Sequence, residues 1–506
     1  MTSLLRSPKR ASILDPGAGL GVFLEELAYA GYNHTTGVEL DAALVAANPA
    51  PIDCASFIPW SKGRSFDAVI GNPPYVRWRD LSEQLRQEVR THHLYRDLFN
   101  NLSDYLTVFI AASVECLTPS GELIFITPSF WMHAQHSAAL REWLLEQGSI
   151  TDLVDFGETA IFDGVTSSLV VFRFEKDAAR TPINYYRYKG SSPLGDRDLS
   201  LDDRTTFMKR RIPAFKPAQH WALASTKELR AASRLESATK RSPRTRGPAS
   251  VVRLGEYVDI ANGMVTGLDH AFKLTPEIYA TLSTRERAAT TVVLKAAQME
   301  SYTSSIFTHY IDLPEGLDED QALRRYPRLL AQLAPHRPQL AARYSYARPT
   351  PYYEWSFKRS EGFFTNGAEK GFVPAKERIS TRSEVRFSTA PAAVVATQDV
   401  TAFAPKTGVR ESIAYIVAYL NQPEVTEWLR SRGVMKGAVA EFSERPLANI
   451  PFRSIDFSND TEIETHRAIT ALMRRHAKGS AALKARAATQ IRSLFNELLF
   501  PQELAQ

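Results

Sequence analysis

Short apolar runs rich in β-branched residues alternate with helical patterns through the first third of the chain. This alternation predicts an α/β fold in which helices cover a mostly parallel sheet. Residues 22–30 and 105–117 carry apolar side chains at helical spacing. The last two expected strands are close in sequence, which predicts an antiparallel edge. The expected strands are residues 11–14, 35–39, 66–70, 122–127, 151–156 and 167–174.

The second half of the chain differs in residue composition and pattern. Residues 190–203 and 240–250 are rich in Gly, Pro, Ser and charged residues, as linkers and exposed loops are. A chain of 506 residues also exceeds what one hydrophobic core usually supports. We therefore expect a first domain at residues 1–180, a linker region at 181–250, a second, α+β domain at 251–455 and a helical tail at 456–506.

The tail is expected to form one or two amphipathic helices over residues 459–499. Packing of this tail against the second domain is favoured over direct contact with nucleic acid. Its polar side carries the cations Arg474, Arg475, Lys478, Lys484 and Arg486.

The composition is that of a soluble globular protein, with 44% hydrophobic and 23% charged residues. A formal net charge of +5 leaves room for a basic surface that follows a phosphate backbone, but supports one only weakly. The first residues do not resemble a signal peptide, and no apolar run is long enough to cross a bilayer. Cys54 and Cys116 form neither a metal-spaced cluster nor a disulfide framework. We expect two buried thiols, no metal site and a cytoplasmic protein.

A glycine-rich turn follows the first expected strand. Asp15 follows the strand and precedes the turn, which contains Gly17, Gly19 and Gly21 and lets the backbone approach a ligand closely. Dinucleotide-binding proteins use similar turns, so the turn alone does not identify the ligand. Glu39, at the end of the second strand, is placed to bind a ribose diol. The acid before the turn suits a ligand with an ammonium group better than a pyrophosphate.

The apolar strand at residues 66–70 is followed by Asn72, Pro73, Pro74 and Tyr75. This loop is expected at the C-terminal edge of the sheet, where open α/β sheets bind their ligands. The two prolines restrict the backbone, and Asn72 is held extended because a proline follows it. The pattern predicts a stiff loop; a proline-rich turn with a locally satisfied Asn is the alternative interpretation.

Such a loop suits methylation of an aromatic amine, which is a poor nucleophile because its lone pair is delocalised into the ring. The Asn72 side-chain oxygen and the Pro73 carbonyl can each accept one amine hydrogen and bias the nitrogen toward a tetrahedral shape. Catalysis then consists of positioning and of stabilising developing positive charge, without an obligatory general base. Tyr75 offers a face on which a base can stack.

With these residues the sequence resembles the gamma class of amino-methyltransferases, the N6-adenine DNA methyltransferases of type II restriction-modification systems, of which the Taq enzyme is an example. The motifs follow the family's order along nearly the whole chain. The resemblance implies a Rossmann-like, S-adenosylmethionine-dependent catalytic domain at residues 1–180 and a target-recognition domain at residues 251–455. It also implies methyl transfer to N6 of a flipped adenine.

The resemblance assigns roles to residues around the cofactor. The segment from Asp15 to Gly21, followed by Phe23, matches the cofactor motif, and Glu39 matches the ribose-binding acid. Phe57 would pack on the cofactor adenine. Beside it stands Ser56, where the family usually has Asp, which puts a hydrogen bond to the cofactor's amino group in doubt. A further family motif upstream of the turn is absent, truncated or replaced.

The resemblance also assigns residues to the target base and to DNA. Asn72 to Tyr75 match the catalytic motif, and Phe162 would stack on the flipped adenine, with a core position as the alternative. Residues 254–267 and 447–451 are similar to parts of the specificity domain. The implied partner is double-stranded DNA. Independently of the resemblance, the basic residues around the linker are candidate phosphate contacts, with a solvated loop as the equally favoured alternative: Lys209, Arg210, Arg211, Lys240, Arg241, Arg244 and Arg246.

Two other functions stay open. Release-factor methyltransferases use the same Asn-Pro-Pro-Tyr chemistry on a glutamine amide, although they are shorter. A DNA-binding homologue without catalysis is the second alternative, and the presence of Asp15, Glu39 and Asn72 argues against it. We expect a monomer in a bacterial or archaeal cytoplasm, with any restriction performed by a separate endonuclease. The DNA sequence that would be recognised cannot be read from the chain.

Overall fold

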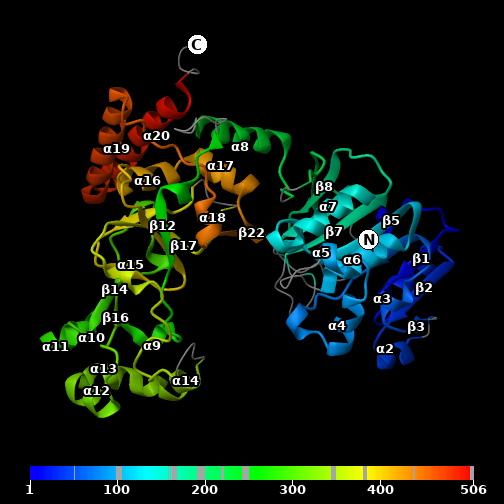
Figure 1. Ribbon diagram of the computed structural model, residues 1–506, viewed down its shortest axis with the longest axis horizontal. Coiled ribbons are helices and arrows are strands. Elements are labelled where there is room, and N and C mark those ends of the chain that lie inside the picture. Colours follow the sequence, from blue (N-terminus) through cyan, green and yellow to red (C-terminus); the bar gives the residue numbers. More distant parts are fainter. Residues whose placement is uncertain are drawn as a thin grey trace. The chain divides into compact units, whose positions relative to one another are not determined.

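The computed structural model divides into two units by its internal contacts, and Figure 1 labels the elements of both. The first unit comprises Met1–Leu229 and Met435–Ala438, and the second comprises Arg230–Val434 and Val439–Gln506. The structure describes residues 1–48, 50, 52–98, 105–157, 159, 161, 168–190, 200–217, 221–241, 250–343, 349–379, 384–436 and 439–501.

Nine strands form one sheet in the first unit. They are β1 (Ser12–Asp15), β2 (His34–Glu39), β3 (Ile52–Cys54), β4 (Phe66–Gly71), β5 (Leu117–Pro128), β6 (Gly148–Gly157), β7 (Leu169–Lys176), β8 (Ile183–Tyr188) and β9 (Phe207–Ile212). Their order is β3-β2-β1-β4-β5-β7-β6-β8-β9. The strands from β3 to β5 are parallel, whereas β7 is antiparallel to both of its neighbours and β9 is antiparallel to β8 at the edge.

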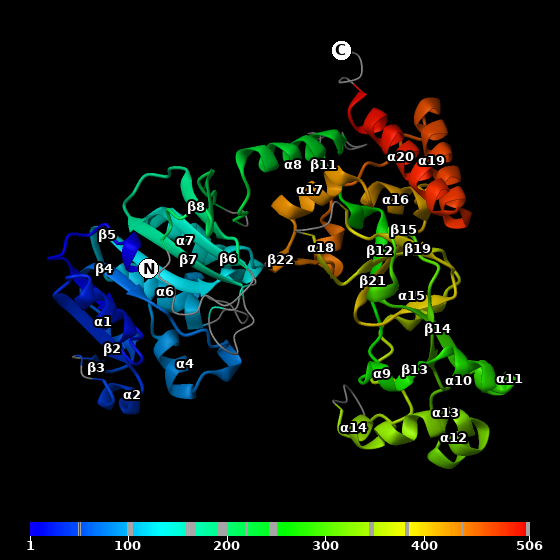
Figure 2. The same ribbon diagram turned by 180° about the vertical axis from the view of Figure 1, so that it is seen from behind.

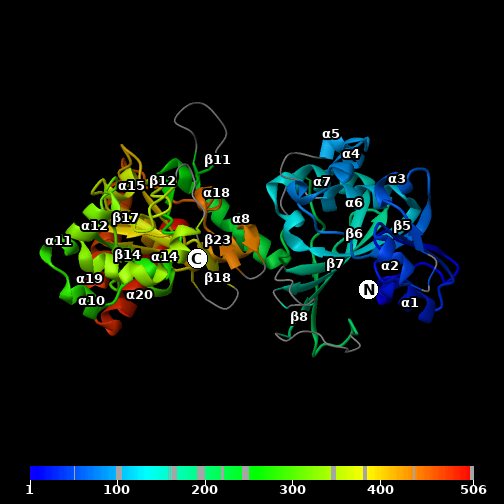
Figure 3. The same cartoon turned by 90° about the horizontal axis from the view of Figure 1, so that it is seen from below.

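Helices cover both faces of this sheet. They are α1 (Val22–Tyr29), α2 (Ala42–Ala46), α3 (Phe57–Trp60), α4 (Glu83–Arg90), α5 (Tyr95–Leu98), α6 (Tyr105–Glu115) and α7 (Ala138–Gln147). Val69 of β4 packs into the same cluster as Phe109 of α6, whereas its neighbours Ala68 and Ile70 pack with Leu27 of α1. Figure 3 shows α6 and α7 on one side of the strands and α1 on the other. Burial on both faces explains why these strands are continuous apolar runs.

The predicted α/β fold with a mostly parallel sheet is confirmed. The predicted antiparallel pairing of the last two strands is also present, but β7 is inserted between β5 and β6, and β9 is the strand at the edge. Residues 181–250, expected as a linker, contain β8 and β9, so the first unit extends to Leu229. Ile183 and Tyr185 of β8 are buried in the core of the first unit. This short strand was not predicted because polar segments flank it. Cys116 is buried as expected, but Cys54 is exposed at the end of β3.

The second unit mixes small sheets with helices. One sheet has the order β12-β21-β17-β19-β15, and another has the order β13-β16-β14-β20. The strands are β10 (Lys240–Arg241), β11 (Ser250–Val251), β12 (Val258–Asn262), β13 (Lys273–Leu274), β14 (Thr290–Leu294), β15 (Tyr302–Thr303), β16 (Thr308–Ile311), β17 (Lys370–Pro374), β18 (Lys376–Arg378), β19 (Ser388–Ala390), β20 (Val394–Ala396), β21 (Val400–Pro405) and β23 (Val439–Glu441). This arrangement agrees with the α+β class expected for residues 251–455.

Two long helices close the second unit. α19 (Asp460–Lys478) and α20 (Ala481–Leu499) pack on each other and lie side by side in Figures 1 and 2, and α19 also contacts α16 and β15. The other helices are α8 (Thr226–Ala238), which contains the boundary between the units, α9 (Asp269–Phe272), α10 (Pro276–Thr281), α11 (Thr284–Arg287), α12 (Glu319–Arg325), α13 (Pro327–Leu333), α14 (Arg337–Ala341), α15 (Glu361–Thr365), α16 (Ile413–Leu420), α17 (Pro423–Arg432) and α18 (Glu444–Ala448). Among the described residues, no helix combines the length and apolar character needed to traverse a bilayer.

Candidate functional site

The glycine turn between β1 and α1 is fixed to the end of β2. The amide of Gly19 donates a hydrogen bond of 2.9 Å to the Glu39 carboxylate. Gly21, which caps α1, is left-handed with a φ of 79°. A Cβ at this position would lie 2.1 Å from the side-chain nitrogen of Asn48. The last residue of the turn must therefore be glycine, and the acid at the end of β2 faces the turn.

Asp15 is fully buried at the end of β1, below the turn. Neither of its carboxylate oxygens has a hydrogen-bond partner among the described residues. Burial raises the pKa of Asp15 to about 7; the amide of Gly17 opposes the rise, and the charge of Glu39 adds to it. A buried acid with so little hydrogen bonding is costly, so this carboxylate favours a ligand group that brings positive charge.

The loop after β4 lies against the same turn. Gly71, the last residue of β4, is so close to Asp15 that a Cβ on it would lie 2.6 Å from Oδ1 of that acid. The backbone oxygen of Asn72 lies 3.8 Å from the position of a Cβ on Gly17. Two motifs that are far apart in sequence therefore meet at one edge of the sheet, where the loop after β4 was expected.

Tyr75 is folded back against its own loop. Its hydroxyl donates to the side-chain oxygen of Asn72 and also lies 2.7 Å from the carbonyl oxygen of Ile126. Burial raises the pKa of the Tyr75 phenol, so the group remains a donor. The ring is partly buried and packs against the apolar clusters of the sheet.

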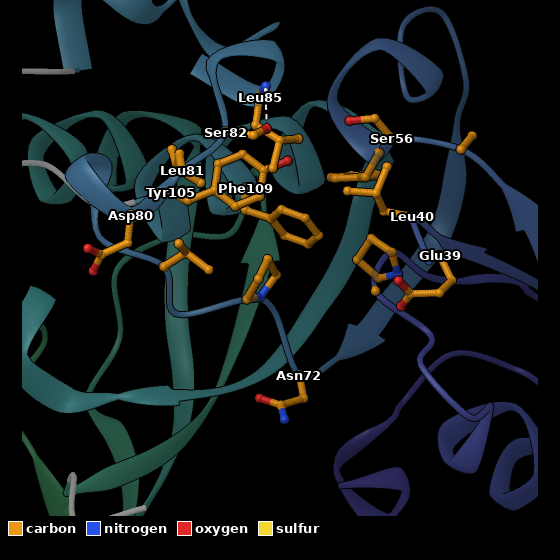
Figure 4. Close-up of a pocket in the computed structure, with 16 residues that line it drawn as sticks. Glu39, Leu40, Ser56, Asn72, Asp80, Leu81, Ser82, Leu85, Tyr105 and Phe109 are labelled. Atoms are coloured by element: carbon orange, nitrogen blue, oxygen red, sulfur yellow. Dashed lines mark hydrogen bonds between the residues drawn. The ribbon is translucent and has the colours of Figure 1, made fainter. Parts of the chain in front are cut away.

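A cavity of about 420 Å³ opens between the turn and the loop, a size that suits a small ligand. Figure 4 shows Glu39 and Ser56 at one side of it, Asp80 and Leu81 at the other, and the Asn72 amide pointing away from the aromatic rings. The lining residues are Pro16, Gly17, Glu39, Leu40, Ala55, Ser56, Phe57, Asn72, Pro74, Val76, Asp80, Leu81, Ser82, Leu85, Tyr105 and Phe109. Among them, Phe57 and Phe109 pack with ring centroids 4.7 Å apart, which gives one wall an aromatic surface.

A hydrogen-bonded network supports the wall at Ser56. The hydroxyl of Ser56 donates to the carboxylate of Glu88 on α4, and Gln84 donates to the other oxygen of that carboxylate at 3.3 Å. Tyr105 also bonds to Ser56, and burial raises the pKa of Tyr105 to about 12. Because the hydroxyl proton of Ser56 is directed at Glu88, its oxygen is left to accept a hydrogen bond from another partner.

The cavity gathers six of the predicted site residues: Gly17, Glu39, Ser56, Phe57, Asn72 and Pro74. Asp15, Gly19, Gly21, Phe23, Pro73 and Tyr75 are not among its lining residues; they belong to the turn, the start of α1 and the loop. Phe162 lies outside the described residues, so its predicted position beside the target base is untested.

Sequence reasoning missed the wall built by α4 and α6. The side chains of Leu81, Ser82 and Leu85 line the cavity, together with Tyr105 and Phe109. A signal for α4 was present, because Ser82 caps the helix through the amide of Leu85 and apolar residues recur at spacings of four. The short length of α4 and its many charged residues concealed that pattern.

One group among the described residues could hold a metal: His92, His93 and Glu115, whose ligand atoms lie within 4.8 Å of one another. Both imidazoles contact the Glu115 carboxylate, at 3.2 and 2.8 Å, and the two rings stack on each other. These contacts account for the cluster without an ion.

Comparison with known proteins connects this geometry to a family. Residues 31–162 match the family model described as Eco57I restriction-modification methylase. The type II methyltransferase M.HindII of Haemophilus influenzae is 36% identical over 482 residues, which cover 94% of this chain and 91% of that protein. M.HincII, also a type II methyltransferase of Haemophilus influenzae, is 35% identical over 476 residues, with coverage of 94% and 91%.

A solved structure shares the fold. The type IIL restriction-modification enzyme MmeI, solved in complex with DNA, matches 97% of this chain and 70% of its own with a TM-score of 0.63 and 12% identity. That likeness concerns the fold alone, whereas the two Haemophilus relatives align with nearly the full length of the chain at much higher identity. The protein therefore belongs to the family of type II methyltransferases that contains M.HindII and M.HincII.

Proposed function

We propose that this type II methyltransferase transfers a methyl group from S-adenosylmethionine to the N6 amine of an adenine in duplex DNA. The observation that carries the proposal is the position of Asn72, which lines the cavity between the glycine turn and α6. Its side chain is attached to a stiff loop, next to a site whose residues suit a nucleoside with a cationic tail.

The residues of the cavity and of the adjoining turn fit S-adenosylmethionine in three respects. Glu39 lies at the end of β2, where a carboxylate can accept from ribose hydroxyls. Phe57 offers an apolar surface to a purine ring. Asp15 does not line the cavity, but its buried carboxylate lies below the glycine turn and supplies negative charge that suits the cationic end of the ligand. When bound, this cofactor supplies an electrophilic methyl carbon on a sulfonium.

We infer that Ser56 and Glu88 together replace the acid that the family usually has at this position. Glu88 accepts the hydroxyl proton of Ser56 and Tyr105 bonds to the same hydroxyl, which leaves one lone pair of the Ser56 oxygen to accept a hydrogen from the cofactor's exocyclic amine. Glu88 is then a positioning residue that acts through Ser56. A hydrogen bond to a polarised hydroxyl would restore selectivity for adenine over a base without that amine.

The loop residues activate the target amine. The Asn72 side-chain oxygen and the Pro73 carbonyl accept its two hydrogens, so that the nitrogen lone pair turns toward the methyl carbon. The two oxygens also stabilise the positive charge that develops on nitrogen. The two prolines keep the acceptors in place, and the proton can leave to solvent after transfer.

The target base must leave the duplex to reach this loop. We propose that Tyr75 and Phe162 contact the extruded adenine, and that residues 251–455 read the DNA sequence. The α+β class of the second unit and the similarity of the fold to that of MmeI support this division of labour. A separate endonuclease is the proposed partner in restriction.

The direct test is to identify the methylated atom. The purified protein is incubated with S-adenosylmethionine labelled in the methyl group and with DNA of mixed sequence, and the DNA is digested to nucleosides. We expect the label in N6-methyldeoxyadenosine. Label in another nucleoside would refute the adenine assignment. No transfer, together with no cofactor binding by calorimetry, would indicate an inactive homologue.

A further inference from the structure

A groove lined by cations lies between α19 and α20 in the second unit. Its volume is about 630 Å³. The cations are Arg474, Arg475 and Lys478 on α19 and Arg486 on α20, and all four side chains are exposed. The other described residues that line the groove are Leu472, Gly479, Leu483, Ala487 and Gln490.

The positive charge of this groove is not balanced within it, because no acidic residue is among its described lining residues. Other cations in the chain differ in this respect. Lys484, also on α20, pairs with Glu300 at 3.1 Å. Arg210, one of the residues expected to contact phosphate, pairs with Glu228 at 3.1 Å. The cations of the groove are therefore more available to an anion than Lys209 and Arg210, which pair with Asp202 and Glu228.

Helix stability explains only part of this arrangement. Cations in the last turn of a helix interact favourably with its dipole, which accounts for Arg475 and Lys478 at the end of α19. Arg486 gains nothing from that effect because it lies in the first two turns of α20. Placing it opposite the cations of α19 adds repulsion, which an anionic ligand would relieve.

The lining of the groove favours phosphate groups over bases. The groove contains three arginines and a lysine, and both residue types commonly bind phosphate in proteins. The guanidinium group of arginine can bind two phosphate oxygens at once. Arg474 and Lys478 are one helical turn apart, so their side chains extend from the same face of α19. None of the described lining residues is aromatic, so the groove offers no surface on which an unstacked base could lie. These features suit the backbone of a duplex, which is recognised without reading its sequence.

We propose that the groove between α19 and α20 binds the phosphate backbone of duplex DNA and anchors the second unit to it. The choice of DNA over other polyanions rests on the proposed function, because a DNA methyltransferase must hold its substrate while a base is extruded. α19 packs on α16 and β15, so phosphate contacts made in the groove would act directly on the unit that is proposed to read the bases.

Salt dependence of binding tests this proposal. The groove variant replaces Arg474, Lys478 and Arg486 with Gln, which preserves helix propensity. Affinity for a fluorescently labelled duplex of random sequence is measured from 50 to 200 mM KCl. The loss of three phosphate contacts should make the fall in affinity over this range about 40-fold smaller than for the unchanged protein, since each contact contributes about 0.9 to the slope of log affinity against log salt.

A matched control separates the groove from net charge. Replacing Arg467, Lys484 and Arg492 with Gln removes the same charge from the same two helices, at residues that do not line the groove. We expect this variant to keep the slope of the unchanged protein. An equal loss of slope in both variants, or none in the groove variant, would overturn the proposal, as would a failure of the unchanged protein to bind duplex.

Methyl transfer measured on the same samples distinguishes this proposal from the proposed function. If the protein methylates DNA but the groove variant keeps the salt dependence of the unchanged protein, the groove proposal is wrong and the proposed function stands. If the salt dependence falls in the groove variant but the protein transfers no methyl group to DNA, the proposed function is wrong and the groove proposal stands.

Discussion

The Tyr75 hydroxyl donates a hydrogen bond to the side-chain oxygen of Asn72, the atom proposed to accept a hydrogen from the target amine. A carboxamide oxygen has two lone pairs, so one can accept from Tyr75 while the other accepts from the substrate. The contact restrains the Asn72 side chain, and the single phenol hydrogen is shared between Asn72 and the carbonyl oxygen of Ile126. Tyr75 therefore holds the acceptor in position, in addition to any stacking by its ring.

This relationship predicts that Tyr75→Phe lowers kcat while leaving base extrusion intact. The variant keeps the ring and loses only the hydroxyl, and a hydrogen bond of about 1 kcal/mol corresponds to a fall of roughly five- to tenfold. Fluorescence of 2-aminopurine at the target position should still rise on binding, whereas it should weaken in Tyr75→Ala. An unchanged kcat in Tyr75→Phe would show that the hydroxyl has no positioning role.

Asn72→Ala is expected to retain DNA binding and to lower the rate of methyl transfer by at least about 100-fold, since it removes an acceptor that stabilises developing charge. Single-turnover transfer and duplex affinity are the two measurements. Asn72→Asp is the control, because it retains an acceptor oxygen at the same position, and it should keep more activity than the alanine variant. Near-normal methyl transfer by Asn72→Ala would show that the Asn72 side chain does not activate the target amine.

Much of this site could be predicted from sequence because it depends on local chain geometry. Asp15, Glu39 and Asn72 each lie at the C-terminal end of a strand or directly after it, and parallel strands bring such ends to one edge of a sheet. Apolar runs identified the strands, the glycines identified the turn after β1, and the prolines identified the stiff loop after β4. The position of each motif could therefore be predicted from the residue pattern of its own segment.

The parts that could not be predicted depend on contacts between distant segments. Glu88 meets Ser56 only because α4 packs near α3, and no local pattern in either segment reports that contact. The strand β8 was not predicted because its short apolar alternation lies between polar segments. Its pairing with β6 is a tertiary contact that this local pattern does not indicate. The basic residues of α19 and α20 were visible in the sequence, but their arrangement around one groove was not.

Cofactor affinity is predicted to depend on pH through Asp15. Burial raises the pKa of this acid to about 7, so at lower pH it is increasingly neutral and attracts a cationic ligand less. An α-amino group stays protonated below about 7.7, so the ligand does not titrate in the same range. Calorimetry should show several-fold weaker binding of S-adenosylmethionine at pH 6 than at pH 7. Asp15→Asn should bind weakly at both, and a parallel fall in that variant would exclude Asp15 as the cause.

The same shift has a consequence for the stability of the protein without cofactor. The ordinary pKa of an aspartate is 3.8, so between about pH 4 and pH 7 the folded protein keeps a proton on Asp15 that the unfolded chain has lost. Stability therefore falls as pH rises through this range. Thermal unfolding of Asp15→Asn should show a smaller decrease in Tm from pH 5 to pH 7 than the unchanged protein. An identical decrease would mean that Asp15 ionises normally in the folded state.

Glu88→Gln is predicted to weaken binding of S-adenosylmethionine by about 10-fold or more, because hydrogen bonds to charged groups contribute about 1.5–3 kcal/mol. The amide that replaces the carboxylate can donate to Ser56 and so reverse the direction of the hydroxyl. Glu83→Gln, on the same helix but paired with Arg90 at 2.7 Å, removes the same charge and should bind normally. The decisive comparison uses S-adenosylhomocysteine and its analogue with hypoxanthine in place of adenine. The unchanged protein should prefer the adenine form, and the Glu88 variant should lose that preference. If both proteins discriminate equally, Ser56 does not read the exocyclic amine and Glu88 serves only to hold α4 in place.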